Sequence, residues 1–586
     1  MAKKLPPVDV VLVGFGWTGA IMAQELTEAG LQVLALERGG WRDTPTHFPT
    51  TLAPDELRFY WRQEMFQDPA RETLTFRNND GQTALPMRRW GSFLPGSGVG
   101  GSGVHWNGQT FRFLPSDFVA ASHNSERYGP LPEGMTVQDY GVTYDELEPH
   151  FDRFEKLCGI GGKAGNLRGA LQAGGNPFEG RRSDDYPNPP MEMTFAQKRF
   201  GAAASELGLS PFPAPSANMS RPYTNPLGVQ LAPCTYCGFC EKYGCGNYSK
   251  AAPQTTILPV LMGKPNFTLK THNEVLEIKR DGSGRRATGV THVDVNGEVF
   301  EQPAEIVILC AYPLQNARLL MLSGIGKTYD PRSGEGLVGK NYCYQVVSSV
   351  DVFYEDKYTN QFAGAGALGM VIDDYNGDNF DHTGLGFIGG GYLACWTTNA
   401  RPIETHRTPE GTPEWGAAWK KAVKENFLKS TGISTHGASM AYAQNHLDLD
   451  PTYTDVYGRP LLRMTYDFTP NDRSMTAYLT DRAKEIAERM GGREIKVNAR
   501  EGAYDSMPYQ TTHNTGGTIM GSNPANSVVN RYLQSWDVPN LFIMGAGVFP
   551  QNAGYNPTGT VAALTYWAAD AIKSRYIRNP GPMVQA

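Results

Sequence analysis

The N-terminal residues contain a complete nucleotide-binding unit, and this unit limits the possible folds more than any other feature. An apolar, β-branched run from Val8 to Val13 predicts a buried parallel strand. The turn G-F-G-W-T-G follows, with glycines at Gly14, Gly16 and Gly19. In such a turn the three glycines make the bend, admit the backbone to a pyrophosphate and let the next helix lie on the sheet. A second strand ends on Glu37, where a carboxylate would bind ribose hydroxyls. The unit predicts an α/β dinucleotide-binding domain, and a tight turn that binds no nucleotide is the alternative.

The C-terminal segment helps to choose between FAD and NAD. Residues 540–550, N-L-F-I-M-G-A-G-V-F-P, predict a strand that runs into a glycine turn at Gly545. A helix is predicted to begin near Pro557. A C-terminal strand, turn and helix that return to the nucleotide are typical of flavoproteins, so the pattern favours FAD.

Four of the eight cysteines lie in one short run with the spacing C-x2-C-x2-C-x4-C, at Cys234, Cys237, Cys240 and Cys245. Compact cysteine runs of this kind hold iron–sulfur clusters. Structural zinc is one alternative, although it prefers two separated C-x2-C pairs. Disulfides are the other, although these short spacings make pairing awkward. The spacing therefore favours an iron–sulfur site.

Length and composition set broad limits. A chain of 586 residues is too long for one simple core, so we expect two closely packed domains. The formal net charge of −6 gives no reason to expect a nucleic-acid partner. The sequence has no apolar run long enough to cross a bilayer. Two lysines, Lys3 and Lys4, precede no apolar signal region, so we expect either a cytoplasmic protein or export by a partner's signal.

Several segments together resemble the glucose–methanol–choline (GMC) oxidoreductase family, and they cover most of the chain. They are the first glycine turn with Glu37, residues 96–107 (G-S-G-V-G-G-S-G-V-H-W-N), 317–326 (A-R-L-L-M-L-S-G-I-G), 336–341 (G-L-V-G-K-N), 513–521 (H-N-T-G-G-T-I-M-G) and Asn556-Pro557. The resemblance implies a GMC-type, Rossmann-like FAD-binding domain interleaved with an α+β substrate domain built on an antiparallel sheet.

The expected domain layout follows this resemblance. The FAD-binding domain would comprise residues 1–120, 230–345 and 510–586, with the cysteine segment inside its second piece. Residues 346–509 would form the substrate domain, and residues 121–229 an irregular excursion that contacts a partner.

Local patterns refine this layout. Strand-like segments are predicted at 346–354 and 384–392, and a helix at 475–490. The stretch 160–230 is rich in glycine, proline and asparagine, which predicts irregular structure.

The glycine-rich segment before His105 is expected to contact the flavin. Gly100, Gly101 and Ser102 lack bulky side chains, so the backbone there can press against the flat isoalloxazine. In relatives with G-G-x-x-x-H this histidine is joined covalently to the flavin, and His105 stands in that place. The alternative is a histidine that only packs or forms hydrogen bonds. Asn107 is a candidate to hydrogen-bond the flavin or the substrate.

His513 resembles the catalytic histidine of the family. A neutral imidazole is suited to remove the hydroxyl proton when an alcohol is oxidised near neutral pH. Asn556 stands at the second polar position of the family, and its amide can donate to a developing alkoxide. Asn514 is a neighbour with a possible substrate role. The alternative for His513 is a structural histidine in a glycine-rich turn.

The cysteine segment makes the chain similar to the large flavoprotein subunits of membrane-bound sugar and sugar-acid dehydrogenases. The similarity implies oxidation of a sugar or sugar-acid hydroxyl, with D-gluconate to 2-keto-D-gluconate first and fructose, sorbitol or glucose as alternatives. Relatives hold a [3Fe-4S] cluster through three cysteines, so Cys237 would be spare unless all four hold a [4Fe-4S] cluster. Alternative classes are a GMC oxidase that uses O2 and a non-catalytic electron-transfer flavoprotein subunit.

The same similarity implies partners and a location. Electrons would pass from FAD to the cluster, then to a multihaem c-type cytochrome subunit that anchors the protein, and then to quinone. A small subunit with a twin-arginine signal would export the folded chain to the periplasmic face of the inner membrane. No direct membrane span is expected.

Overall fold

The computed structural model describes residues 2–48, 65–66, 68–88, 93–398, 406–507 and 509–584. The N-terminal unit forms as predicted, from β2 (Val8–Val13) through α1 (Trp17–Glu28) to β3 (Val33–Leu36). Gly14 has a φ of +97°, and a Cβ there would stand 2.7 Å from the carbonyl oxygen of Cys310. A Cβ on Gly19 would stand 2.3 Å from the carbonyl oxygen of Gly14. Larger residues therefore cannot replace either glycine without moving the backbone.

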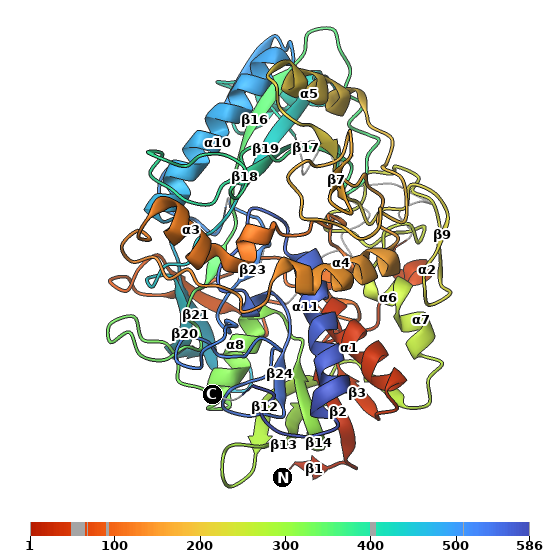
Figure 1. Cartoon of the computed structure of the whole chain (residues 1–586), viewed down its shortest axis with the longest axis vertical. Coiled ribbons are helices and arrows are strands. Elements are labelled where there is room, and N and C mark those ends of the chain that lie inside the picture. Colours follow the sequence, from red (N-terminus) through yellow and green to blue (C-terminus); the bar gives the residue numbers. More distant parts are fainter. Residues whose placement is uncertain are drawn as a thin grey trace.

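The largest sheet carries this unit and combines distant parts of the chain (Figure 1). Its strand order is β11-β3-β2-β14-β13-β12, and β1 and β24 also pair with β14. β11, β3, β2, β14 and β24 run parallel, whereas β13 and β12 continue as an antiparallel extension. The strands not yet given are β1 (Lys3–Lys4), β11 (Phe267–Lys270), β12 (Glu274–Arg280), β13 (Ala287–Val293), β14 (Val299–Leu309) and β24 (Leu541–Ile543).

The second sheet is antiparallel and lies at the opposite end of the molecule (Figure 1). Its order is β22-β16-β19-β18-β17-β8. Helix α10 (Pro470–Arg489) packs on β16 and β19, and α5 (Phe195–Glu206) packs on α10 and β17. The strands are β8 (Phe212–Pro213), β16 (Val346–Phe353), β17 (Gly369–Ile372), β18 (Gly391–Trp396), β19 (Ser430–Gly437) and β22 (Glu494–Asn498).

Smaller elements complete the fold. A four-stranded sheet has the order β20-β21-β4-β5. Its strands are β4 (Leu74–Arg77), β5 (Leu85–Pro86), β20 (His446–Thr454) and β21 (Pro460–Thr465). The further helices are α2 (Thr44–His47), α3 (Ala120–Tyr128), α4 (Tyr144–Cys158), α6 (Pro253–Thr256), α7 (Leu258–Leu261), α8 (Pro313–Leu322), α9 (Gly416–Asn426) and α11 (Thr558–Ala571).

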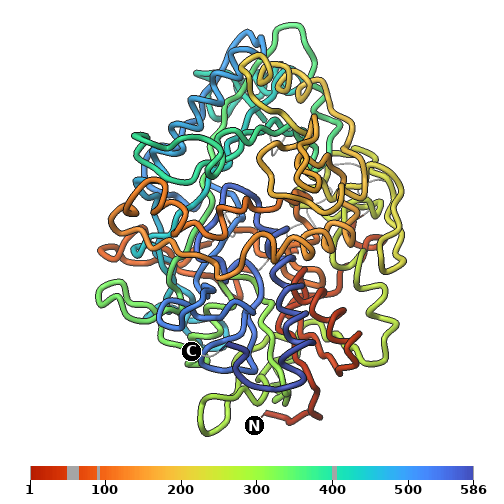
Figure 2. Tube along the Cα trace, viewed as in Figure 1, coloured from red at the N-terminus to blue at the C-terminus, as the bar shows by residue number. Residues whose placement is uncertain are grey.

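The two ends of the chain meet on the large sheet. Figure 2 shows the N-terminal and C-terminal segments side by side, where α11 packs against α1 and α4. The predicted fold class is confirmed, because a Rossmann-like parallel sheet with helices is combined with a separate antiparallel sheet. Within the described residues, none of the helices is both long and apolar enough for a membrane crossing.

Two local predictions were wrong. The segment 384–392 becomes a strand only from Gly391, because Gly384, Gly386 and Gly389 all adopt positive φ. The stretch 160–230 is not irregular throughout, since it contains α5. That helix begins after Thr194, whose backbone N–H donates to Gln197 Oε1 at 2.8 Å, and its alanines favour a helix despite the surrounding glycines and prolines.

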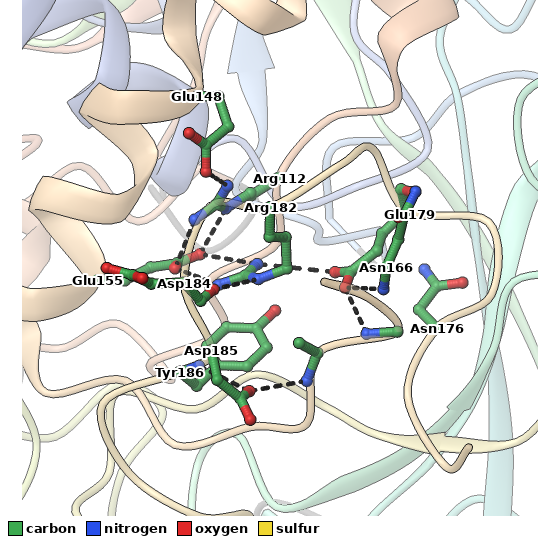
Figure 3. Close-up of polar contacts among 12 residues, drawn as sticks. Arg112, Glu148, Glu155, Asn166, Asn176, Glu179, Arg182, Asp184, Asp185 and Tyr186 are labelled. Carbon is green, nitrogen blue, oxygen red and sulfur yellow. Dashed lines mark hydrogen bonds and ion pairs between the residues drawn. The ribbon is translucent and has the colours of Figure 1, made fainter. Parts of the chain in front are cut away.

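A buried ion network fixes the loop after α4 (Figure 3). Arg112 donates to both carboxylate oxygens of Glu155 at 2.8 Å and to Glu148 at 2.9 Å. Arg182, which is fully buried, donates to the same Glu155 and stacks on Tyr186. Burial raises the pKa of Glu155, but the two arginines outweigh it and hold this pKa below its ordinary value. The loop is therefore attached to α4 by buried ion pairs instead of by regular secondary structure.

Candidate active site

One cavity of about 590 Å³ extends from the large sheet to the antiparallel sheet. Its walls include Val13 and Leu36 from β2 and β3, and Val347 and Ile433 from β16 and β19. A volume of this order is typical of small-molecule and cofactor sites. The predicted site residues line this cavity except for Gly19, Gly100 and the four cysteines.

The nucleotide end of the cavity is formed by backbone. Gly16 and Gly101 approach so closely that a Cβ on Gly101 would stand 3.1 Å from Cα of Gly16. A Cβ on Gly16 would occupy cavity space, with its nearest neighbours at 3.9 Å. Gly545, with a φ of +101°, leaves similar space where β24 ends. The expected FAD fits here, since glycine leaves room for a pyrophosphate at the N-terminus of α1.

Glu37 lines the cavity, and its carboxylate organises the surrounding loops. It accepts backbone N–H groups from Phe15 at 3.0 Å, Gly39 at 2.8 Å and Gly98 at 3.0 Å. One carboxylate thus fixes the first glycine turn and the glycine-rich segment in a single arrangement. A ribose would share these oxygens with the backbone groups, because a carboxylate can accept about four hydrogen bonds.

The glycine-rich segment turns sharply before His105. Gly100 and Gly101 have positive φ angles of 97° and 52°. Gly100 donates its N–H to Phe15 O at 2.7 Å, which places it behind the cavity wall. Ser102 Oγ accepts the N–H of Gly96 at 3.0 Å. The segment therefore shapes the cavity mainly through its backbone.

His105 is buried beside the cavity with one nitrogen unused. Its Nε2 lies 3.1 Å from Leu94 O, whereas Nδ1 has no hydrogen-bond partner among the described residues. Burial, helped by the nearby ammonium of Lys250, lowers the pKa of His105 to about 3. A neutral, buried imidazole with an unpaired nitrogen is consistent with a group that awaits a bond.

Two other predicted cofactor residues, Asn107 and Pro557, also line the cavity. Asn107 Oδ1 accepts the N–H of Gln109 at 3.1 Å. Pro557 is the residue before α11, and so it starts the helix that leads back from the cavity to the large sheet.

His513 and Asn556 meet although 43 residues separate them in sequence. Asn556 Oδ1 accepts the hydroxyl of Tyr392 at 2.8 Å, which turns the amide nitrogen toward His513 Nε2 at 3.0 Å. On the other side of the ring, Nδ1 contacts Gln345 Oε1. Burial lowers the pKa of His513 to about 4, so the imidazole is neutral near pH 7.

The orientation of Gln345 determines the tautomer of His513. Gln345 donates its amide N–H to Gly554 O at 2.9 Å, so its oxygen must face the ring. His513 then carries its proton on Nδ1, and the lone pair on Nε2 faces Asn556 and the cavity. This arrangement can accept a proton from a substrate hydroxyl.

Asn514 is held away from such a role. Its oxygen accepts the Tyr342 hydroxyl at 2.6 Å, and its nitrogen donates to the Tyr312 hydroxyl at 2.7 Å. Tyr312 itself lines the cavity with a φ of +78°, which is unusual for a tyrosine.

Sequence reasoning missed four polar residues of the cavity region: Gln345, Tyr392, His436 and Arg500. His436 stacks on Tyr392 with ring centres 4.6 Å apart, and burial followed by the charge of His513 lowers its pKa to about 3. No local motif marks these residues, because strand pairing and loops bring them to His513 from distant parts of the sequence.

The four clustered cysteines lie outside the cavity wall and are all free thiols, as are the other four. Burial, with added repulsion from Cys245 and Cys237, raises the pKa of Cys234 to about 12. Nowhere in the described parts of the chain do three His, Cys, Asp or Glu side chains come close enough to hold a metal ion. The soft donor set suits an iron–sulfur cluster, but in this arrangement the thiols do not share one coordination sphere.

The cysteine segment is nevertheless attached to the backbone around His105. Lys242 donates its N–H to His105 O at 2.8 Å. The buried ammonium of Lys250 donates to Trp106 O at 2.6 Å and to Cys240 O and Tyr243 O at 2.8 Å each. The proposed flavin-attachment residue and the cysteine run are therefore parts of one hydrogen-bonded unit.

Comparison with known proteins agrees with this architecture. Two family models described as GMC oxidoreductase match residues 216–347 and 441–565. Pyridoxine 4-oxidase from Mesorbium loti has a similar fold, with a TM-score of 0.58 at 16% identity over 96% of this chain and 98% of that one.

Full-length relatives carry the argument further. The chain is 47% identical to the gluconate 2-dehydrogenase flavoprotein of Pantoea cypripedii over 100% of its own length and 97% of that protein. It is 25% identical to the fructose dehydrogenase large subunit of Gluconobacter japonicus over 98% of this chain and 99% of that one. From the two family models and the first of these relatives together, the chain belongs to the GMC oxidoreductase family.

Proposed function

We propose that the protein is an FAD-dependent dehydrogenase that oxidises a hydroxyl of a sugar acid, with D-gluconate to 2-keto-D-gluconate as the leading reaction. The observation that carries this proposal is the His513–Asn556 pair, in which Nε2 of His513 is the proton-accepting nitrogen and lies beside a cavity bordered by the nucleotide-binding turn. The 47% identity to a gluconate 2-dehydrogenase flavoprotein supports the choice of substrate.

The residues divide the chemistry between them. When bound, FAD supplies the two-electron acceptor for the hydride that leaves the carbinol carbon. His513 Nε2 accepts the hydroxyl proton, while Gln345 keeps the other ring nitrogen protonated. Asn556 donates its amide N–H to the oxygen as negative charge develops there. Gln345 and Asn556 are buried and His513 is half-buried, which limits the access of water to the proton transfer.

Two further cofactor features belong to the same proposal. FAD is attached covalently through His105, which the unpaired Nδ1 supports. The cysteine segment carries a [3Fe-4S] or [4Fe-4S] cluster, supported by its four buried or half-buried soft thiols and its hydrogen bonds to the backbone of His105 and Trp106. Assembly of a cluster requires the thiols to move together from the positions seen here.

We also propose partner subunits. One of the full-length relatives is the large subunit of a fructose dehydrogenase, which supports an assembly with further subunits. For this chain we propose a small subunit with a twin-arginine signal and a c-type cytochrome subunit that passes electrons to quinone, at the periplasmic face of the membrane. Co-expression with the small subunit should move the chain to the periplasm, and a complex that stays in the cytosol would contradict this.

The central experiment measures anaerobic flavin reduction in the purified holoenzyme. D-Gluconate, fructose, sorbitol and glucose are compared in stopped flow, followed by turnover with an artificial acceptor and with O2. Gluconate should give the highest kcat/KM, and O2 should be a poor acceptor. Fast reoxidation by O2 would instead identify an oxidase, and no reduction by any alcohol would exclude a catalytic role for the flavin.

A further inference from the structure

Two arginines, Arg407 and Arg500, line the part of the cavity formed by the antiparallel sheet. They differ in whether a carboxylate is paired with the guanidinium. Arg407 Nε donates to Asp351 Oδ1 at 2.9 Å, so its charge is already paired with a carboxylate. Arg500 has no carboxylate partner among the residues that the structure describes.

The contacts of Arg500 position it without neutralising it. Its Nε donates to Val347 O at 3.3 Å, and its guanidinium lies 4.6 Å from the ring centre of Tyr509. The Tyr509 hydroxyl in turn donates to Gln345 O, and the N–H of Val347 donates to that hydroxyl at 2.9 Å. A fixed, half-buried guanidinium with free N–H groups is suited to bind a carboxylate through two hydrogen bonds.

Arg500 is hydrogen-bonded to the backbone two residues from Gln345, the residue that contacts His513. Val347, which Arg500 contacts, pairs with His436 across β16 and β19, and it follows Gln345 by two residues. Gln345 in turn contacts His513 Nδ1. The guanidinium is thus attached to the same stretch of backbone that holds the base.

Arg407 lies in the segment before α9 and contacts β16 farther along that strand, at Asp351. Its partner Asp351 pairs with Gly432, and a Cβ on Gly432 would stand 2.8 Å from Arg407 Nε. Asp351 is four residues beyond Val347, which corresponds to about 13 Å along a strand. Within a hydroxy acid, the carboxylate carbon is bonded directly to the carbon that carries the 2-hydroxyl. Of these two arginines, Arg500 is the better placed for that short separation, because its contact on β16 lies closer to Gln345 and His513.

We propose that Arg500 binds the carboxylate of a 2-hydroxy acid substrate and so directs oxidation to the carbon next to it. This assignment rests on the proposed dehydrogenase function and narrows its substrate class. In that oxidation the C2–H bond would break, with FAD, when bound, supplying the acceptor for the hydride, while the O–H proton would pass to His513 Nε2 and a C2=O bond would form. The carboxylate stays on Arg500 and is chemically unchanged.

Kinetics of the holoenzyme with Arg500→Met, Arg500→Lys and Arg407→Met test the assignment. Arg500→Met should raise the KM for D-gluconate by about 10- to 100-fold, the loss expected for charge-assisted hydrogen bonds. Its kcat/KM for sorbitol should stay within about threefold of the wild type. Arg500→Lys should recover part of the loss. An equal loss with both substrates, an unchanged KM for gluconate, or a larger loss in Arg407→Met would overturn the proposal.

A binding measurement without turnover tests the role of Arg500 separately from the proposed dehydrogenase function. Calorimetry with 2-keto-D-gluconate measures anion binding without turnover, and Arg500→Met should weaken it by a similar factor. Binding that is the same in both proteins would overturn the role of Arg500 even if gluconate is oxidised. If binding depends on Arg500 but no alcohol reduces the flavin, the dehydrogenase function fails while the carboxylate site stands. Unchanged flavin absorbance in each variant verifies that the cavity is intact.

Discussion

The amide nitrogen of Asn556 lies 3.0 Å from Nε2 of His513, and the Tyr392 hydroxyl fixes the orientation of that amide. The imidazole lone pair is therefore already hydrogen-bonded before substrate enters. In the proposed mechanism a substrate hydroxyl would displace Asn556 from this lone pair, and the released amide N–H would then be free to donate to the substrate oxygen. One exchange of partners thus prepares both the base and the oxyanion donor.

The first prediction concerns His513 itself. His513→Ala should slow flavin reduction by about 10²- to 10⁴-fold, the usual worth of a positioned acid–base group. Stopped-flow reduction at saturating substrate measures this effect. The flavin content should stay equal to that of the wild type, and a reduction rate within threefold of the wild type would rule out the role.

The second prediction is a pH profile. The pKa of His513 is lowered to about 4, so the imidazole becomes protonated, and loses its ability to accept a proton, only as the pH falls toward that value. The acid limb of kcat/KM should therefore lie near pH 4 instead of near 6.5. Gln345→Glu places a carboxylate beside Nδ1, stabilises the imidazolium and should move the limb upward by one unit or more. A limb that stays in place would show that Gln345 does not control the base.

These two predictions show what the sequence could and could not supply. His513 and Asn556 lie in short glycine- and proline-containing segments, and the local sequence pattern is enough to single them out as candidates. Gln345 precedes His513 by 168 residues, and no spacing or periodicity connects them. Their contact depends on how β16 meets the segment before β23 (Asn514–Thr515), which is a property of long-range packing.

The third prediction tests the flavin attachment. Acid precipitation of the wild type should leave the yellow colour in the pellet, whereas His105→Ala should release it into the supernatant. The physical reason is that His105 offers an unpaired Nδ1 inside the cavity wall. Buried His292 in β13 also has unpaired ring nitrogens but does not line the cavity, so His292→Ala is a matched control that should keep the flavin bound.

The fourth prediction concerns the cysteine segment. The purified protein should contain at least three irons per chain with matching sulfide. Cys240→Ser should lower iron and sulfide and block electron delivery to the cytochrome partner, while flavin reduction by substrate stays near normal. Cys395→Ser, in β18 of the other sheet, is the control. One zinc and no iron would contradict the cluster.

The nucleotide unit and the cysteine run differ in how much of the structure their local sequence patterns could predict. Gly14 to Glu37 lie in one βαβ unit, so their spacing alone determined their geometry. The cysteine spacing predicted a shared environment, and the thiols do influence one another's pKa. It could not predict that a buried ammonium, Lys250, would connect this run to Trp106.

The fifth prediction concerns stability. Arg182→Met should lower the free energy of unfolding by about 3 kcal/mol, because it leaves the buried carboxylates of Glu155 and Glu179 with one cation fewer. Chemical denaturation measures this change. Arg168→Met is the matched control in the same loop, since Arg168 is 71% exposed in its ion pair with Asp184 and should cost less than about 1 kcal/mol. Equal losses in the two variants would contradict a special role for the network.

The three carbonyl oxygens held by Lys250 belong to the segment after His105 and to the cysteine run. Lys250 therefore couples the position of the cysteine run to that of the backbone beside His105, the proposed flavin-attachment residue. By linkage, if occupation of one site strengthens binding at the other by a given free energy, occupation of the second site strengthens binding at the first by the same free energy. If the proposed cluster and flavin both bind, we therefore expect the loading of one to affect the loading of the other.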